Sequence, residues 1–292
     1  MKLKYLQAIL LCLWSMNISA QKVSNITSND KQLSKDTIPL QVLDNSLYRV
    51  FYSLYFVKDT SQVELKTEGQ SLLMIGSKYS AFLDYNNLRK DSLYNALAQQ
   101  EGINSMTVIS KTISIGRRIQ FKPIVIKNYP QKGECTFQEM ITSKDYYQYV
   151  DKNIKLDWAL SSEEKELQGY VCKKATCSYR GRDYTAWYCP DIPINDGPYV
   201  FNGLPGLILE IYDSQEHYKF SMNGFSKAPA QDPIYLHAKD IVHSSRKDVR
   251  KIISNLKANP ASMAQMISSN VKVSDEVLQK LQPKPYNPIE LE

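Results

Sequence analysis

The densest group of reactive side chains lies between Gly181 and Glu210, in the stretch GRDYTAWYCPDIPINDGPYVFNGLPGLILE. Arg182 and Asp183 are adjacent there, and Asp191 and Asp196 share one loop, so a hydrolase of unknown type is one hypothesis. The sequence pattern brings no partner acid to these carboxylates. The chain also lacks the G-x-S-x-G, H-E-x-x-H, G-x-x-x-x-G-K and dinucleotide-binding motifs, which argues against the commonest enzyme classes.

Histidine and cysteine are few, and neither is arranged as a recognisable metal site. Three histidines are predicted to lie on the surface rather than to act as bases: His217, His237 and His243. Beyond the first 20 residues the chain has four cysteines: Cys135, Cys172, Cys177 and Cys189. In an exported chain an even count predicts disulfides, with several possible connectivities. Our first choice is Cys172 with Cys189, which leaves Cys135 with Cys177. Zinc is disfavoured, because the C-x4-C spacing of Cys172 and Cys177 has no second knuckle. We expect no catalytic residue, no metal and no cofactor.

Residues 1–20, MKLKYLQAILLCLWSMNISA, have the three parts of an export signal, with cleavage expected after Ala20. An uncleaved membrane anchor is the alternative, but the apolar stretch is short for a bilayer. Loss of this segment removes two lysines and lowers the formal net charge from +6 to +4. Positive residues are scattered, so we expect no nucleic-acid partner. The mature protein is predicted to lie in the periplasm or at the cell surface and not to span the membrane.

The 292 residues, of which 43% are hydrophobic, suffice for one sizeable core. Polar residues 21–45 predict a flexible leader. Aromatic and β-branched runs joined by tight turns over residues 46–225 predict a mainly β domain, a bent antiparallel meander that is half-open-barrel-like or sandwich-like. Strands are expected at residues 48–57, 135–141, 146–151, 207–213 and 218–224. Hairpins are expected at residues 71–85, with a turn near Gly76, and at residues 169–189, with a turn at residues 180–183. A period-two pattern adds a half-buried strand at 113–122, and residues 88–100 are expected to be helical.

Residues 226–292 are predicted to be a helical C-terminal segment of the same domain. Ser245 is a good N-cap, and apolar residues recur at helical spacing from Val249 to Leu256. This amphipathic stripe is expected to pack on the sheet. A second helix is predicted from Pro260, and a short third one over residues 274–281.

The block at residues 181–210 permits two interpretations. Its bulky residues could form a lid or rim over a ligand, or a stiff crossover that plugs one end of the sheet. The ligand or lid candidates are Trp187, Tyr188, Tyr199, Phe201 and Leu204. The structural motif is Gly203, Leu204, Pro205, Gly206, Leu207 and Ile208. Pro205 and Gly206 fit the central positions of a type II turn, where glycine supplies the positive φ.

The motif at residues 203–208 is the one after which the GLPGLI family is named, and the chain resembles that family. The resemblance extends to Gly169–Tyr170, Lys174–Ala175, Arg180–Arg182, Ala186–Tyr188, Ile192–Pro193, Gly197–Pro198 and the closing Asn287–Leu291. Cys189 departs from the family pattern, which has threonine or a similar residue there. The resemblance implies an exported protein of Bacteroidota without an established activity, and it supplies no catalytic residues.

Three hypotheses for function remain. The favoured one is a non-catalytic binding or scaffold protein of the cell envelope, with an apolar cleft for a lipid-like or peptide ligand. The others are the hydrolase and a structural subunit of an envelope complex. Convergent acids would favour an enzyme, and a flat apolar patch would favour a subunit.

Overall fold

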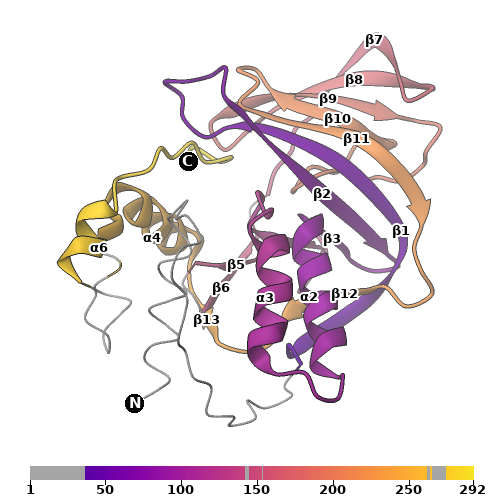
Figure 1. The fold of residues 1–292 in the computed structure, drawn as a ribbon. Helices are drawn as coiled ribbons and strands as arrows, with labels where there is room; N and C mark the ends of the chain where they lie inside the picture. Colours follow the sequence, from indigo (N-terminus) through magenta and orange to yellow (C-terminus); the bar gives the residue numbers. More distant parts are fainter. Residues whose placement is uncertain (1–36, 142–144, 153, 262–263, 265–273) are drawn as a thin grey trace.

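The computed structural model describes residues 37–141, 145–152, 154–261, 264 and 274–292 (Figure 1). They form a mainly β fold around one 13-stranded, mostly antiparallel sheet, with a helix in the C-terminal part. The predicted fold class is therefore confirmed. The predicted export signal lies outside the described residues, as does most of the predicted leader. The leader was placed too far along the chain, because β1 already begins at Leu40.

Two antiparallel meanders build the sheet. The first comprises β1 (Leu40–Val57), β2 (Lys66–Gly76), β3 (Ser80–Asp84), β4 (Ile124–Lys127), β5 (Cys135–Met140) and β6 (Tyr146–Asp151). The second comprises β7 (Ala159–Leu167), β8 (Tyr170–Tyr179), β9 (Arg182–Cys189), β10 (Leu207–Asp213) and β11 (Tyr218–Lys227). β1 pairs with β11 and thereby joins the two meanders, with Val50 opposite Phe225. The sheet bends strongly in Figure 1, as expected of a wide sheet of twisted strands.

The C-terminal part is less helical than predicted. β12 (Pro233–His237) pairs with the start of β1, and β13 (Ile241–His243) pairs parallel with β6, an exception to the all-antiparallel prediction. The helices begin only at α4 (Arg246–Ala258), where the Ser245 side chain accepts a hydrogen bond from the Asp248 amide, as its cap position predicts. The short α6 (Asp275–Lys280) follows. The helix predicted from Pro260 falls largely on residues outside the described ranges.

Both faces of the first meander are buried. Along β1, the alternate residues Val50, Tyr52 and Leu54 face the core that packs against the crossover at residues 190–206. On β2, Leu72 and Met74 face the opposite core, which contains Leu88 of α2. Because side chains alternate between the faces of a strand, runs of bulky residues with no polar alternation are what such a sheet requires.

A helical pair, α2 (Tyr85–Ala98) and α3 (Ser105–Gly116), stands on one half of the sheet in Figure 1. The half-buried strand predicted at residues 113–122 was therefore wrong. Asn104 caps α3 by accepting from the Thr107 amide, and the buried Val108 and Thr112 are four residues apart, which is helical spacing. The period-two match arises because it spans the end of α3 and the following extended segment, which the Asp84 carboxylate holds by accepting from the Gln120 and Phe121 amides.

The crossover between β9 and β10 packs against one face of the sheet, where polar contacts also hold it. Lys127 of β4, itself buried, forms an ion pair with Asp196 and donates to the carbonyl of Gly197 at 2.6 Å. The turn at its end differs from the type II prediction, since the Gly206 amide donates to the Leu204 carbonyl at 2.8 Å, around Pro205. Gly206 has a φ of 150°, and a Cβ there would lie 2.1 Å from the Cys189 oxygen. Only glycine fits this position.

Candidate functional site

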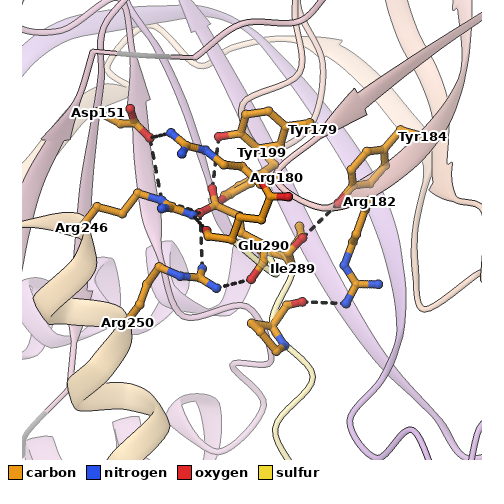
Figure 2. Close-up of polar contacts among 12 residues, drawn as sticks. Asp151, Tyr179, Arg180, Arg182, Tyr184, Tyr199, Arg246, Arg250, Ile289 and Glu290 are labelled. Atoms are coloured by element: carbon orange, nitrogen blue, oxygen red, sulfur yellow. Dashed lines mark hydrogen bonds and ion pairs between the residues drawn. The ribbon is translucent and has the colours of Figure 1, made fainter.

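Several strand ends meet at one rim of the sheet. The β8–β9 turn consists of Arg180 (φ 48°) and Gly181 (φ 79°), and two positive φ values are what a tight type I′ hairpin turn requires. This turn fixes the register of the flanking strands, so that Tyr179 lies opposite Arg182. The end of β6, with Asp151, and helix α4 lie beside it, joined through the contacts that Figure 2 shows.

The last residues of the chain, 287–292, lie across this rim as an extended segment that we call the tail. Prolines at 283, 285 and 288 disfavour a helix here. The tail's four consecutive carbonyls from residue 287 to 290 each accept a hydrogen bond from a side chain of the folded body. The donors are Tyr218 to Asn287 at 2.6 Å, Arg182 to Pro288 at 2.7 Å, Tyr184 to Ile289 at 3.1 Å, and Arg250 to Glu290. In addition, the Leu291 amide donates to the Arg180 carbonyl at 2.8 Å, and Arg246 donates to the Glu292 carbonyl.

Glu290 is the centre of the contacts in Figure 2, and its side chain is 1% exposed. One carboxylate oxygen accepts from the hydroxyls of Tyr199 at 2.5 Å and Tyr179 at 3.2 Å. The other oxygen accepts from Arg246 at 2.6 Å and Arg250 at 3.3 Å, which are one turn apart on α4. Burial, together with the Glu290 charge, raises the pKa of Tyr179 and Tyr199 far above its ordinary value, so both phenols remain donors.

Asn287 is the second tail residue whose side chain is bound by the body of the protein. Its side-chain oxygen accepts from Arg182 at 2.6 Å, and its side-chain nitrogen donates to the Val57 carbonyl at 2.8 Å. Arg182 is in turn paired with Asp213 at 2.7 Å, and both side chains are buried. The tail is therefore held at two side chains and along its backbone. We call the body residues that hold it the tail clamp: Tyr179, Arg180, Arg182, Tyr184, Tyr199, Tyr218, Arg246 and Arg250.

The five ligand or lid candidates are all buried. Their exposed fractions are 8% or less, and they belong to the core on the crossover face. Tyr199 is the one that reaches the tail clamp. Phe201 packs against Tyr184 with ring centroids 4.5 Å apart, and Trp158 donates to the Asn202 carbonyl at 2.7 Å beside it. The crossover at residues 190–206 is thus packed into the core and carries one clamp residue, Tyr199.

The four cysteines are free and buried thiols, so neither predicted disulfide is present in the structure. Cys172 and Cys189 do lie on the neighbouring strands β8 and β9, but the Cys172 thiol donates to the Tyr170 carbonyl at 3.6 Å. Burial, with the Cys189 neighbour, raises the pKa of Cys172 to about 12. Cys135 and Cys177 lie on β5 and β8, far apart in the order of the sheet.

The acids of the hydrolase hypothesis do not pair with one another, and each described contact joins one of them to a different partner. Asp196 pairs with Lys127, and the exposed Asp183 accepts from the Ser178 hydroxyl at 2.5 Å. Within the described residues no group of three or more His, Cys, Asp or Glu could hold a metal ion. A pocket of about 180 Å³ lies next to the crossover, lined in part by Asn128, Cys135 and Gly203. Among the described helices, none has the length and apolar character of a membrane span.

A second buried polar cluster lies on the opposite face, where α2 meets β5 and β12. We call it the α2 joint: Asp91, Gln138, Tyr235 and His237. The prediction that His237 lies on the surface was wrong, since it is 2% exposed. Its Nε2 lies 2.9 Å from Asp91, and its Nδ1 lies 3.2 Å from the Gln138 oxygen. The Gln138 nitrogen donates to the His237 carbonyl, which fixes the amide with its oxygen toward the ring. Both ring nitrogens thus face acceptors, with the Asp91 carboxylate on one side of the ring and the Gln138 oxygen on the other.

Most tail-clamp residues were not predicted as a site. Arg180 and the closing residues 287–291, which include Glu290, stand in the sequence analysis only as family hallmarks. Arg182 appears there as a hallmark and in the hydrolase hypothesis, and Arg246 and Arg250 carry no signal of their own. A glutamate between two apolar residues in a proline-rich tail resembles any solvated charge. Its burial depends on arginines more than 35 residues away, which no local pattern encodes.

Comparison with known proteins finds a family model that matches a short part of the chain. A family described as "Protein of unknown function (Porph_ging)" matches residues 179–210. The matched segment begins at Tyr179 and contains five of the eight clamp residues: Tyr179, Arg180, Arg182, Tyr184 and Tyr199. No curated protein matches the chain.

Two solved structures of PNGF-II, in space groups P21 and C2, are similar to 73% of this chain, with TM-scores of 0.48 and 0.49 and 14% sequence identity. The match covers 34% and 33% of those chains, so this chain spans about a third of the length of the solved proteins that it matches.

Proposed function

We propose that the protein is an exported, non-catalytic binding or scaffold protein of the cell envelope, a member of the GLPGLI family, whose tail clamp holds an extended polypeptide segment. The observation that carries this proposal is the capping of four consecutive tail carbonyls by side chains of the body. Side-chain donors aimed at main-chain carbonyls grip an extended segment by its backbone, as peptide-binding sites do.

A peptide is favoured over a lipid-like ligand by the packing of the crossover. The candidates for an apolar lid pack against one another and against Tyr184 instead of lining an open cavity. The pocket beside Gly203 has about 180 Å³, whereas small-molecule sites usually have about 300–1,000 Å³. The polar, elongated tail clamp is the better match to a polypeptide.

Binding is favoured over hydrolysis by the pairing of the charged groups. Arg182, Asp196 and Asp213 are each engaged in a buried ion pair that fixes one element to another. Such pairs position the crossover and the β10–β11 turn rather than leaving a carboxylate directed at a substrate. The third hypothesis, a structural subunit, differs from the proposal only in whether the bound segment belongs to a permanent partner.

The binding test uses a chain that ends at Tyr286, checked for cooperative unfolding, and a fluorescent peptide Asn-Pro-Ile-Glu-Leu-Glu. We expect saturable binding in the micromolar range by fluorescence anisotropy. The matched control carries Tyr184→Phe and Tyr218→Phe, which remove two carbonyl donors at little change in volume, and should bind more weakly. A folded chain that fails to bind the peptide would contradict the proposal.

Export is tested separately on protein recovered from the envelope. We expect the mature chain to begin at or near Gln21. N-terminal sequencing measures this start. A chain that retains Met1 would contradict cleavage.

A further inference from the structure

The tail clamp forms polar contacts with two side chains of its occupant, while Ile289 packs against the core and the last two side chains are exposed. Glu290 and Asn287 are buried and have their polar atoms paired with the body. In contrast, Leu291 is 52% exposed, and Glu292 is exposed as well. The contacts therefore distinguish the first and the fourth residue of the segment Asn-Pro-Ile-Glu.

The fourth position selects for a negative charge. Arg246 and Arg250 form ion pairs with the Glu290 carboxylate. Arg180 pairs with Asp151 at 2.8 Å, and Asp151 also lies 3.9 Å from Arg246. Burial lowers the pKa of Arg180, but nearby groups that include the Glu290 charge raise it by more. Without Glu290 this position would hold three arginines against one aspartate. Two phenol hydroxyls, from Tyr179 and Tyr199, donate to the same carboxylate. A carboxylate satisfies all these donors, whereas an amide would satisfy fewer of them and leave the positive charge uncompensated.

The clamp is also held in place by contacts that do not involve the tail. Asp213 holds Arg182 at 2.7 Å and accepts from the Tyr218 amide at 2.7 Å. Asp151 holds Arg180, and the type I′ turn fixes Arg180 and Gly181. A site whose groups are positioned without the ligand loses little conformational freedom on binding, so it can accept an equivalent segment from elsewhere.

Resting on the proposed binding function, we propose that the tail clamp is a sequence-selective site for an extended Asn-Pro-Ile-Glu-like segment of another polypeptide chain, read mainly at its first and fourth residues, and that the tail is its exchangeable occupant. The tethered tail has an effective concentration in about the millimolar range, so a free segment displaces it only when the tail is weakened or when the partner adds contacts of its own. Competition from the tail thereby determines how tightly a partner segment must bind in order to occupy the clamp.

The experiment uses the full chain with Asn287→Ala and Glu290→Ala, which weaken the tail without touching the clamp. Labelled Asn-Pro-Ile-Glu-Leu-Glu should bind this variant saturably, and at least about tenfold more tightly than it binds the parent, whose own tail competes. Peptides with glutamine at the fourth position or alanine at the first should bind at least about tenfold more weakly. Adding Arg250→Gln to the variant should reduce the preference for glutamate over glutamine.

The outcomes separate the inference from the proposed function. Equal affinity for the glutamate and glutamine peptides would overturn the selectivity while leaving a peptide-binding clamp. No binding of any peptide to the folded variant would overturn both. Binding to the parent that equals binding to the variant would overturn the exchange with the tail. Should the double variant fail to fold, full chain with Glu290→Gln alone, which keeps the side-chain volume, supplies the same comparison.

Discussion

The tail clamp and the α2 joint are both buried polar clusters, but the clamp binds the backbone of an extended segment and the joint connects regular secondary-structure elements. The clamp directs arginines and tyrosines at the main chain of a segment that has no strand or helix of its own (Figure 2). The joint connects side chains of α2, β5 and β12, three regular elements, through Asp91, Gln138 and His237. One cluster is built to hold a polypeptide backbone, and the other fixes the architecture of the sheet.

The two clusters also differ in the charged groups on which their stability depends. The guanidinium groups of the clamp keep their charge at any ordinary pH. The joint depends instead on the buried Asp91 carboxyl, whose pKa is raised by burial but lowered by more through the hydrogen bond from His237 and the Lys90 charge. Loss of the clamp's contacts should therefore free the tail and spare the sheet, whereas loss of the joint's contacts should loosen α2 against β12.

The largest expected effect concerns the crossover that carries Tyr199 into the clamp. Gly206→Val should prevent cooperative folding, because its Cβ would lie 2.1 Å from the Cys189 oxygen and 2.5 Å from the Cys189 carbonyl carbon. The matched control is Gly169→Val, at a φ of 80° with nothing within 4 Å of the new Cβ. It should cost only the backbone strain of about 1–3 kcal/mol. Urea unfolding followed by circular dichroism compares the two, and equal midpoints would contradict this account of the turn.

The next effect breaks the clamp itself. Glu290→Ala should lower the free energy of unfolding by about 3 kcal/mol, because Arg246, Arg250 and two phenols lose a buried acceptor. Glu290→Gln keeps the volume and some hydrogen bonds and should cost less. Hydrogen exchange of the Leu291 amide, which donates to Arg180, reports tail release directly. A protected Leu291 amide in the alanine variant would show that the carboxylate does not anchor the tail.

The fold was more predictable than either cluster, for a physical reason. Hairpins such as the one around Arg180 and Gly181 arise from contacts between residues close in sequence, and their apolar alternation and turn residues are visible in the chain. The helix α3 was missed because the two-residue alternation from Ile113 to Phe121 runs across its end into the extended segment that follows, whereas in the structure α3 packs against α2. The tail clamp was missed because its contacts join residues 179–184, 246–250 and 287–292, which only the completed sheet brings together.

The third effect tests the joint by its dependence on pH. Burial opposes ionisation of Asp91, but the hydrogen bond from His237 and the Lys90 charge outweigh it, and the net result is a lowered pKa. A carboxyl whose pKa is lowered in the folded state stabilises it above the ordinary value of 3.8, and the stabilisation disappears as the pH falls through the folded-state pKa.

Asp91→Asn should therefore cost about 2 kcal/mol at pH 6, the scale of a hydrogen bond to a charged group. The difference from the parent should shrink below about pH 4. Urea unfolding at several pH values measures it. If the difference in the free energy of unfolding between Asp91→Asn and the parent stays constant down to pH 2, the charge of Asp91 does not stabilise the fold. If the Leu291 amide loses its protection from hydrogen exchange in this variant, the two clusters are coupled.

The smallest effect distinguishes apolar from polar attachment of α4, which carries two of the clamp's arginines. The sequence predicts a continuous apolar stripe on this helix, but in the structure Val249 is buried at 2% exposure while Ile253 is only half-buried. A fully buried isoleucine replaced by alanine costs about 2–5 kcal/mol, so the partly exposed Ile253 should cost about 1 kcal/mol in Ile253→Ala. Val249→Ala removes less volume yet should cost at least as much, because it opens a cavity under the first turns of the helix. Thermal unfolding of the two variants gives the comparison. A loss for Ile253→Ala well above that for Val249→Ala would mean that the apolar stripe, rather than the ion pairs of Arg246 and Arg250 with Glu290, fixes α4 on the rim.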